Sequence, residues 1–137
     1  LTEHGLLNYE VSNWARPGHE CAHNRLYWQQ GEYIGFGSAA HSHVNGRRWW
    51  NVRTPDRFCE LVEAGQSAES AAEMLEPDER RIEGLQLAIR MREGVPTGSF
   101  APDDVALLDG LVVDDGERVR LTRRGRLMAN EVSLRLR

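Results

Sequence analysis

The sequence contains no lysine, so all seventeen of its Lys-or-Arg positions are arginine. It has only two cysteines, Cys21 and Cys59, too few for a disulfide framework, a four-cysteine zinc site or an iron–sulfur cluster on their own. No run approaches the roughly 18 apolar residues of a membrane span, and we find no charged-then-apolar leader. We therefore expect a protein of a reducing compartment, the cytoplasm.

The chain has 137 residues and a formal net charge of −4. This length fits one domain or two very small ones. The acidic balance argues against a general nucleic-acid or membrane binder. Leu1 rather than methionine begins the chain, in what reads as the end of a helix, so we expect a fragment of a longer protein.

The first half of the sequence predicts short elements separated by turns. Gly5 ends a helix remnant, and Pro17-Gly18 and Asn45-Gly46 mark turns, the second of them a hairpin. The expected elements are a strand over 7–14, a helix over 22–30 ended by Gly31, a strand running into a loop over 32–44, and a helix over 55–65 capped by Thr54.

The second half predicts a compact α+β module. The polar stretch 66–76 is the best candidate boundary, so we expect domains over 1–70 and 71–137. Ile82, Leu85 and Ile89 give a helix over 76–94 one apolar face. A helix over 102–110, a hairpin around Asp115-Gly116 and a helix over 122–136 capped by Thr122 complete a winged-helix-like outline.

Histidines and one cysteine alternate in two places, at His19, Cys21 and His23 and again at His41 and His43. Alternate residues of an extended strand share a face, so these five side chains can converge on a metal such as zinc. The spacing matches no specific zinc signature. Loop histidines that hydrogen-bond to the backbone are therefore the favoured interpretation.

Glycines and aromatic residues are dense between residues 27 and 50. Gly35 and Gly37 lack the further residues of a dinucleotide fingerprint, but they suit a tight loop against a flat ligand. Tyr27 and Trp28, with two later tryptophans, are either core or the wall of a planar pocket. A histidine beside such a wall is chemically suited to heme iron.

Arginines concentrate at the end of the chain, with seven of them and a single acid, Glu131, over 118–137. On a winged-helix-like outline they can neutralise nucleic-acid phosphates. That function needs Arg118, Arg120 and Arg126 on one surface. The acidic remainder of the chain favours a solvated face instead, and we expect no nucleic-acid partner.

The stretch YEVSNWARPGHECAHNRLYWQQGEYIGFGSAAHS, residues 9–42, resembles the C-terminal part of HemW-type proteins. These are radical S-adenosylmethionine proteins related to oxygen-independent coproporphyrinogen III oxidase. The resemblance extends over NVRTPDRF and the terminal LVVDDGERVRLTRRGRLMANEV. HNRLYW matches the His-Asn-x-x-Tyr-Trp motif that separates HemW-type heme chaperones from the oxidases.

The resemblance implies an α+β fragment: the last strand and closing segment of a partial (β/α) radical-SAM barrel, followed by the winged-helix-like module. It implies heme binding and transfer to an acceptor protein, with membrane association only through that acceptor. Oxidative decarboxylation of coproporphyrinogen III is the alternative. The family's [4Fe–4S] cluster and S-adenosylmethionine need a three-cysteine motif absent here, so we expect the fragment alone to be inactive.

The resemblance also implies the site. It assigns heme binding to His23, Asn24, Tyr27 and Trp28, with His23 as the iron ligand or attachment residue. In the same interpretation Gly35, Gly37 and His41 line the cofactor pocket, with His41 as the reserve ligand.

Overall fold

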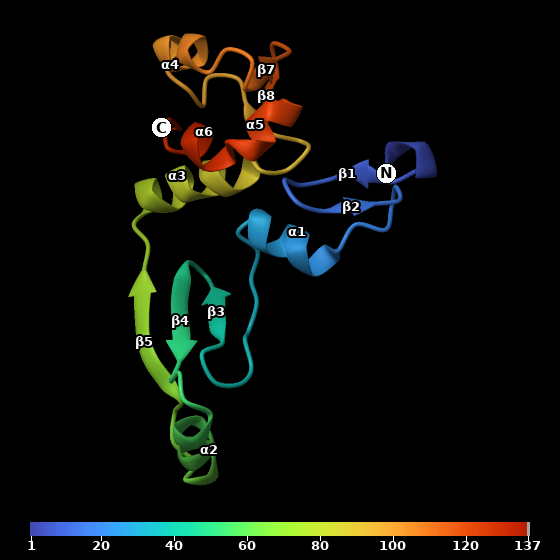
Figure 1. The fold of residues 1–137 in the computed structure, drawn as a ribbon. Coiled ribbons are helices and arrows are strands. Elements are labelled where there is room, and N and C mark those ends of the chain that lie inside the picture. Colours follow the sequence, from blue (N-terminus) through green and yellow to red (C-terminus); the bar gives the residue numbers. More distant parts are fainter. Residues whose placement is uncertain (137) are drawn as a thin grey trace. The chain divides into compact units, whose positions relative to one another are not determined.

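The computed structural model describes residues 1–136 as an α+β chain with two compact units (Figure 1). The two-segment unit consists of Leu1–Gln30 and Arg81–Arg137, and the middle unit of Gly31–Arg80. Neither unit ends at the predicted boundary near residue 70. The assignment of residues 1–70 to a barrel end and of 71–137 to a winged-helix-like module stays a prediction.

The N-terminal segment forms a small hairpin and not the single strand predicted over 7–14. A 3₁₀ helix, η1 (Thr2–His4), ends at Gly5, whose φ of 73° confirms the predicted stop. Strands β1 (Leu7–Asn8) and β2 (Trp14–Ala15) then pair antiparallel. In the turn between them the Tyr9 N–H donates to the Asn13 carbonyl and the Glu10 carboxylate accepts the Ser12 N–H, both at 3.1 Å, interactions that hydrophobic alternation does not reveal.

Helix α1 (Ala22–Trp28) confirms the helix predicted over 22–30, with slightly tighter bounds. Its end comes before Gly31, because Gln30 takes the left-handed conformation with a φ of 51°. The Gln30 amide donates to Glu83 at 3.0 Å, which holds the residue in place despite its backbone conformation.

The middle unit is a three-stranded antiparallel sheet with one helix at its end (Figure 1). Strands β3 (His41–Val44) and β4 (Arg47–Asn51) form the hairpin predicted at Asn45-Gly46, both with positive φ. Helix α2 (Pro55–Glu63) follows Thr54, whose side chain makes no capping bond. The strand predicted from residue 32 is wrong, since before β3 only Tyr33 bridges to the sheet, at His43.

The third strand of this sheet, β5 (Glu69–Met74), lies in the stretch predicted as a domain boundary. Alanines face the tryptophans of β4, with Trp49 opposite Ala72 and Trp50 opposite Ala71. Ion pairs of 2.6 Å and 2.8 Å join Arg47 to Glu69 and Arg48 to Glu73. These cross-strand contacts determine the strand, whereas alanine and glutamate have little intrinsic preference for one.

The remaining elements alternate helices with a second three-stranded sheet, in the order β6-β8-β7. They are α3 (Pro77–Ala88), β6 (Val95–Pro96), α4 (Pro102–Leu107), β7 (Val112–Asp114), β8 (Arg118–Leu121), α5 (Arg123–Leu127) and α6 (Ala129–Ser133). The predicted hairpin and the Thr122 cap are confirmed, the latter by a bond from Gly125 N–H. The single helix predicted over 122–136 is wrong, because Met128 leaves helical geometry at φ −115°.

One apolar core lies among these C-terminal elements. Its buried members come from β6, β8, α6 and the residues next to α3, α4 and α6: Ile89, Val95, Phe100, Leu108, Val119, Val132 and Leu136. Of the apolar face predicted for the helix over 76–94, Leu85 packs against this cluster from within α3. The predicted end at Gly94 is wrong, because α3 stops at Ala88 and Ile89 joins the core from just beyond it. Within residues 1–136 the structure has no helix long and apolar enough to cross a membrane.

Candidate functional site

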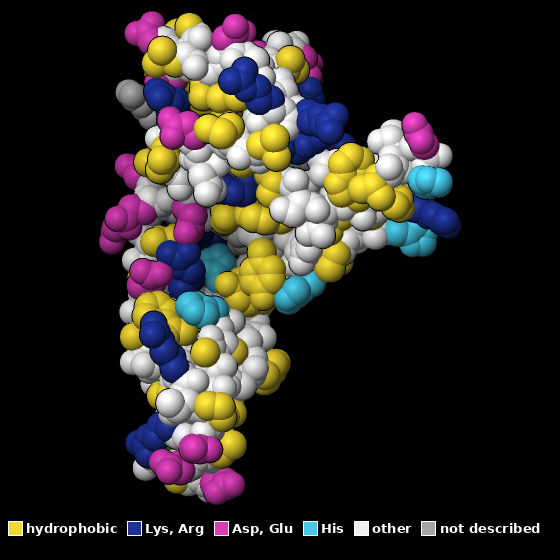
Figure 2. Space-filling view, in the orientation of Figure 1, with side chains coloured by type: hydrophobic (Ala, Val, Ile, Leu, Met, Phe, Trp, Pro, Cys, Tyr) yellow, Lys and Arg dark blue, Asp and Glu magenta, His cyan; other side chains and the backbone are white. Residues whose placement is uncertain are grey.

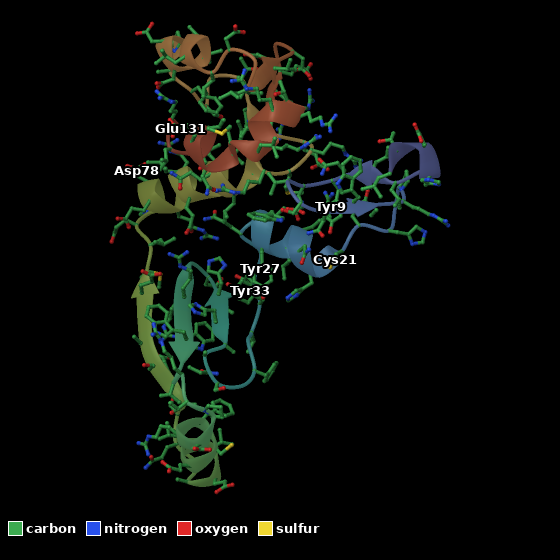
Figure 3. All side chains as sticks on the ribbon, viewed as in Figure 1. Tyr9, Cys21, Tyr27, Tyr33, Asp78 and Glu131 are labelled. Carbon is green, nitrogen blue, oxygen red and sulfur yellow. The ribbon has the colours of Figure 1, made fainter. Side chains whose placement is uncertain are left out.

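Helix α1 carries all four residues of the His-Asn-x-x-Tyr-Trp motif. The rings of His23 and Tyr27, one helical turn apart, meet edge to face with centroids 4.6 Å apart. Both side chains are exposed, Tyr27 by 39%. Figure 3 labels Tyr27 on this helix and Cys21, the residue just before it. The helix thus presents an imidazole and a phenol ring together at the surface.

Other residues of α1 fasten the helix to its own unit. The ring of Trp28 lies 5.8 Å from the guanidinium carbon of Arg90, in cation–π geometry. Arg25 forms an ion pair of 3.2 Å with Glu93. Trp28 and Asn24 are both half-buried. Of the motif, Trp28 therefore anchors the helix, while His23 and Tyr27 remain accessible.

The histidines differ in how the chain uses them. His43 is buried, and its Nδ1 lies 3.0 Å from the carbonyl oxygen of Gly31, as expected for a structural histidine. His23 is exposed and contacts Tyr27, and its ring has no hydrogen-bond partner among residues 1–136. An imidazole with a free lone pair is available to a metal.

The predicted pocket residues Gly35, Gly37 and His41 lie in the middle unit. A side chain at Gly35 would come within 2.2 Å of the His41 carbonyl oxygen, so the close approach met there is to the chain's own backbone. Gly37 has a φ of 100°, a conformation that favours glycine. These local constraints explain both glycines without a ligand, and their contact with a cofactor stays a prediction.

His41 lines a small cavity in the middle unit. Its ring stacks on Trp50 at a centroid distance of 5.6 Å and an interplanar angle of 28°. A cavity of about 230 Å³ lies beside this pair, lined also by Arg53 and Asn51. His41 is exposed, which keeps it eligible as a second imidazole donor.

The seven predicted residues thus form two groups, each within one unit. The structure brings His23 and Tyr27 together on α1 and places Gly35 beside His41 in the middle unit. A single site made of both groups stays a prediction. Among the described residues no three histidine, cysteine, aspartate or glutamate side chains gather closely enough to hold a metal, so the zinc interpretation has no support there.

Sequence reasoning missed one feature near α1, a pair of cavities lined by Arg90 and Arg126. Burial lowers the pKa of Arg90 from its ordinary value. The sequence places Arg126 in a basic tail that, as a nucleic-acid surface, also needs Arg118 and Arg120. Arg118 instead donates to the backbone carbonyl of Glu93 at 3.0 Å, and Arg120 pairs with Asp115. What distinguishes these arginines is their position in the folded unit, which the linear sequence does not show.

Comparison with known proteins gives a consistent group of relatives. No family model matches the chain. It is 38% identical over 137 residues to the heme chaperone HemW of Mycobacterium tuberculosis, with 96% of this chain and 35% of that protein aligned. The heme chaperone HemW of Bacillus subtilis is 32% identical over 146 residues, with 96% of this chain and 38% of that protein aligned. The chain therefore spans about a third of the length of these relatives.

The fold has a counterpart among solved structures. Coproporphyrinogen III oxidase from Escherichia coli, a radical SAM enzyme, superposes with a TM-score of 0.72 over 98% of this chain and 37% of that chain. The sequences are only 20% identical in this alignment, so the likeness establishes a shared fold and no shared activity.

Proposed function

This chain belongs to the HemW-type family of radical S-adenosylmethionine proteins, and we propose that it contributes the heme-binding segment of a heme chaperone. In this proposal α1 takes up heme, which is the cargo, and the whole protein passes it to an acceptor protein. The observation that carries the proposal is the exposed His23 imidazole held against Tyr27 on a helix that is otherwise fastened to its unit.

Each motif residue has a separate part in the proposed site. His23 donates its free ring nitrogen to the heme iron, as histidine does in many heme proteins. Tyr27 packs its ring edge against the imidazole and limits its rotation. Trp28 fixes the helix through Arg90, and the half-buried Asn24 supplies an amide near the same turn. His41, stacked on Trp50, is the reserve ligand.

The longer relatives' radical chemistry is outside the capacity of this chain alone. The [4Fe–4S] cluster of a radical SAM protein needs three closely spaced cysteine thiolates. Cys21 and Cys59 are free and lie in different units. They do not fit such a cluster, so we propose that cluster and S-adenosylmethionine belong to other parts of the whole protein.

The shared fold supports the rest of the proposal in outline. We propose that residues 1–70 contain the last strand and closing segment of a radical-SAM barrel and that 71–137 form a winged-helix-like module beside it. The free cysteines agree with a cytoplasmic protein. The enzymatic alternative, coproporphyrinogen III oxidation, has only the fold likeness in its favour.

A hemin titration tests the proposed function. Hemin is added to wild type, His23→Ala and His41→Ala, and the Soret band is followed. We expect His23→Ala to lose most of the Soret-band shift that hemin binding causes in wild type, because alanine offers no donor to iron. His41→Ala should retain this shift. His19→Ala is the matched control, an exposed histidine four residues earlier.

Two results would contradict parts of this assignment. If His41→Ala loses the band shift while His23→Ala keeps it, the ligand is the middle-unit histidine. If wild type and all three variants behave alike, this segment does not bind heme through these residues.

A further inference from the structure

Two adjoining cavities in the two-segment unit share a wall made of Arg90 and Arg126. The first, of about 580 Å³, is also lined by Ser12, Leu127, Met128 and Asn130. This volume is within the range of roughly 300–1,000 Å³ typical of small-molecule pockets. The second, of about 220 Å³, is lined by the same two arginines together with Asn8, Met91 and Leu121.

Four arginines line the second cavity, and two of them pair with acids that do not line it, Arg92 with Glu20 and Arg120 with Asp115. Arg92 and Arg120 join Arg90 and Arg126 in its lining, and no aspartate or glutamate lines it. The only acid at the first cavity is Glu131, which forms an ion pair of 3.4 Å with Arg135. Such a concentration of positive charge is notable in a chain with a net charge of −4.

The two shared arginines lack carboxylate partners. Arg90 donates to neutral oxygens, the Asn130 amide at 2.7 Å and the Gln86 carbonyl. Arg126 makes no ion pair or side-chain hydrogen bond with any residue in the described part of the chain. By contrast, Arg92 pairs with Glu20 at 3.4 Å. A partly buried guanidinium without a counter-charge is unfavourable, and an anionic ligand would compensate it.

Trp28, a residue of the heme motif, contacts the guanidinium of Arg90. The Trp28 ring lies 5.8 Å from its guanidinium carbon, and the Asn130 bond fixes its other side. Trp28 follows His23 by five residues on α1, which corresponds to about 7.5 Å along the helix axis. Around the helix the two positions are about 140° apart, so the motif is linked to the arginine pair through the contact of Trp28 with Arg90.

Apolar side chains border the same cavity. Leu127 is 84% exposed and Met128 46%, and both line the larger cavity. Figure 2 shows arginines in dark blue next to apolar side chains in yellow over β8 and α5. Exposed apolar residues beside unpaired arginines suit a ligand with an apolar body and acidic groups.

We propose that Arg90 and Arg126 bind the carboxylates of an amphiphilic ligand, the propionate side chains of a porphyrin, whose apolar ring lies on Leu127 and Met128. This inference rests on the proposed function and extends it by naming where the acidic edge of the porphyrin is held. The planar guanidinium fork matches a carboxylate bidentately, which accounts for two arginines at this place. Trp28 then acts as a positioning residue for Arg90.

The test compares hemin with hemin dimethyl ester, in which both carboxylates are masked, on the intact protein. The variants are Arg126→Gln, Arg90→Gln and their double, with Arg124→Gln as the matched control on the same helix, an exposed residue outside both cavities. We expect each single substitution to weaken hemin binding roughly ten-fold and the double to weaken it further. The ester should bind weakly to wild type and respond to none of the substitutions.

The outcomes separate this inference from the proposed function. Because the Arg126 side chain makes no hydrogen bond or ion pair within the described part of the chain, its substitution should leave the thermal unfolding midpoint unchanged, so a weakened affinity reports on the ligand. If the double variant binds hemin as tightly as wild type does, the inference alone is contradicted. Equal binding of hemin and its dimethyl ester by wild type would contradict it as well. A wild type that leaves hemin free contradicts the proposed function and, with it, this inference.

Discussion

The two units differ in how they are stabilised. The C-terminal elements of the two-segment unit enclose seven buried apolar residues, including Ile89, Val119 and Val132 at 1% exposure or less. In the middle unit the buried apolar residue is Leu61 at 8%, and all six residues of β5 are exposed. A region with few buried apolar contacts opens at lower free energy than a packed core. We therefore expect one rigid module and a sheet of low intrinsic stability in this chain, with α1 and its exposed histidine fastened to the rigid unit.

The largest expected effect comes from a cavity in the core of the rigid module. Leu108 is 1% exposed, so Leu108→Ala should lower the free energy of unfolding by about 2–5 kcal/mol. Its neighbour Leu107 is 69% exposed, and Leu107→Ala should change stability by less than about 0.5 kcal/mol. Urea unfolding followed by circular dichroism measures both. Leu61→Ala should cost less than Leu108→Ala, and the reverse order would contradict the comparison between the units.

A smaller loss is expected where two helices of this unit contain glycine. A Cβ at Gly125 would lie 1.9 Å from the Leu111 carbonyl oxygen, so Gly125→Ala must displace backbone and should cost roughly 1–3 kcal/mol. At Gly84 the added Cβ would meet only the Gln30 side-chain oxygen, at 2.8 Å. That flexible group can shift, and alanine's helix preference of about 1 kcal/mol offsets the cost.

Thermal unfolding of Gly125→Ala and Gly84→Ala separates these cases. A near-unchanged midpoint for Gly84→Ala together with a lowered one for Gly125→Ala is the expected pair. Equal losses at both positions would show that the backbone contact at Leu111 does not decide the outcome.

The smallest effect concerns the β7–β8 hairpin and pH. Bonds from Arg120 and from the Arg118 and Glu117 N–H groups lower the pKa of Asp115 from 3.8 to about 2. Because the folded-state pKa is depressed, the carboxylate's stabilising contribution is complete above pH 3.8 and is lost as pH falls toward 2. Asp115→Asn should therefore unfold at a lower midpoint than wild type at neutral pH. In acid the midpoints of the variant and wild type should converge. Asp109→Asn, at an exposed aspartate nearby, is the control and should behave as wild type at both pH values.

The elements predicted correctly are those with strong local determinants. Pro77 and the acidic first turn define α3, Asn45-Gly46 and Asp115-Gly116 define hairpins, and Thr122 caps α5. The misses depend on contacts between distant residues or on single side chains. Strand β5 exists because its alanines and glutamates match β4, and the turn between β1 and β2 includes a side-chain bond to the Glu10 carboxylate.

The candidate site divides in the same way. The motif on α1 follows from the family resemblance, which a sequence can carry because the motif residues lie within one short stretch, 23–28. Sequence cannot distinguish the exposed His23 from the buried His43, whose environment includes the Gly31 carbonyl. The arginine-lined cavities were missed for the same reason, since Arg90 and Arg126 meet only in the folded unit.

Selective broadening of amide resonances by hemin tests the central claim, heme uptake at His23 on α1, most directly. Paramagnetic iron broadens the signals of nearby residues, so a titration of the ¹⁵N-labelled chain locates the metal without mutation. The account predicts that amides of α1 around His23 and Tyr27 broaden first, while those of the Leu108 core persist. Broadening that begins at His41 and Trp50, with α1 unaffected, would contradict it.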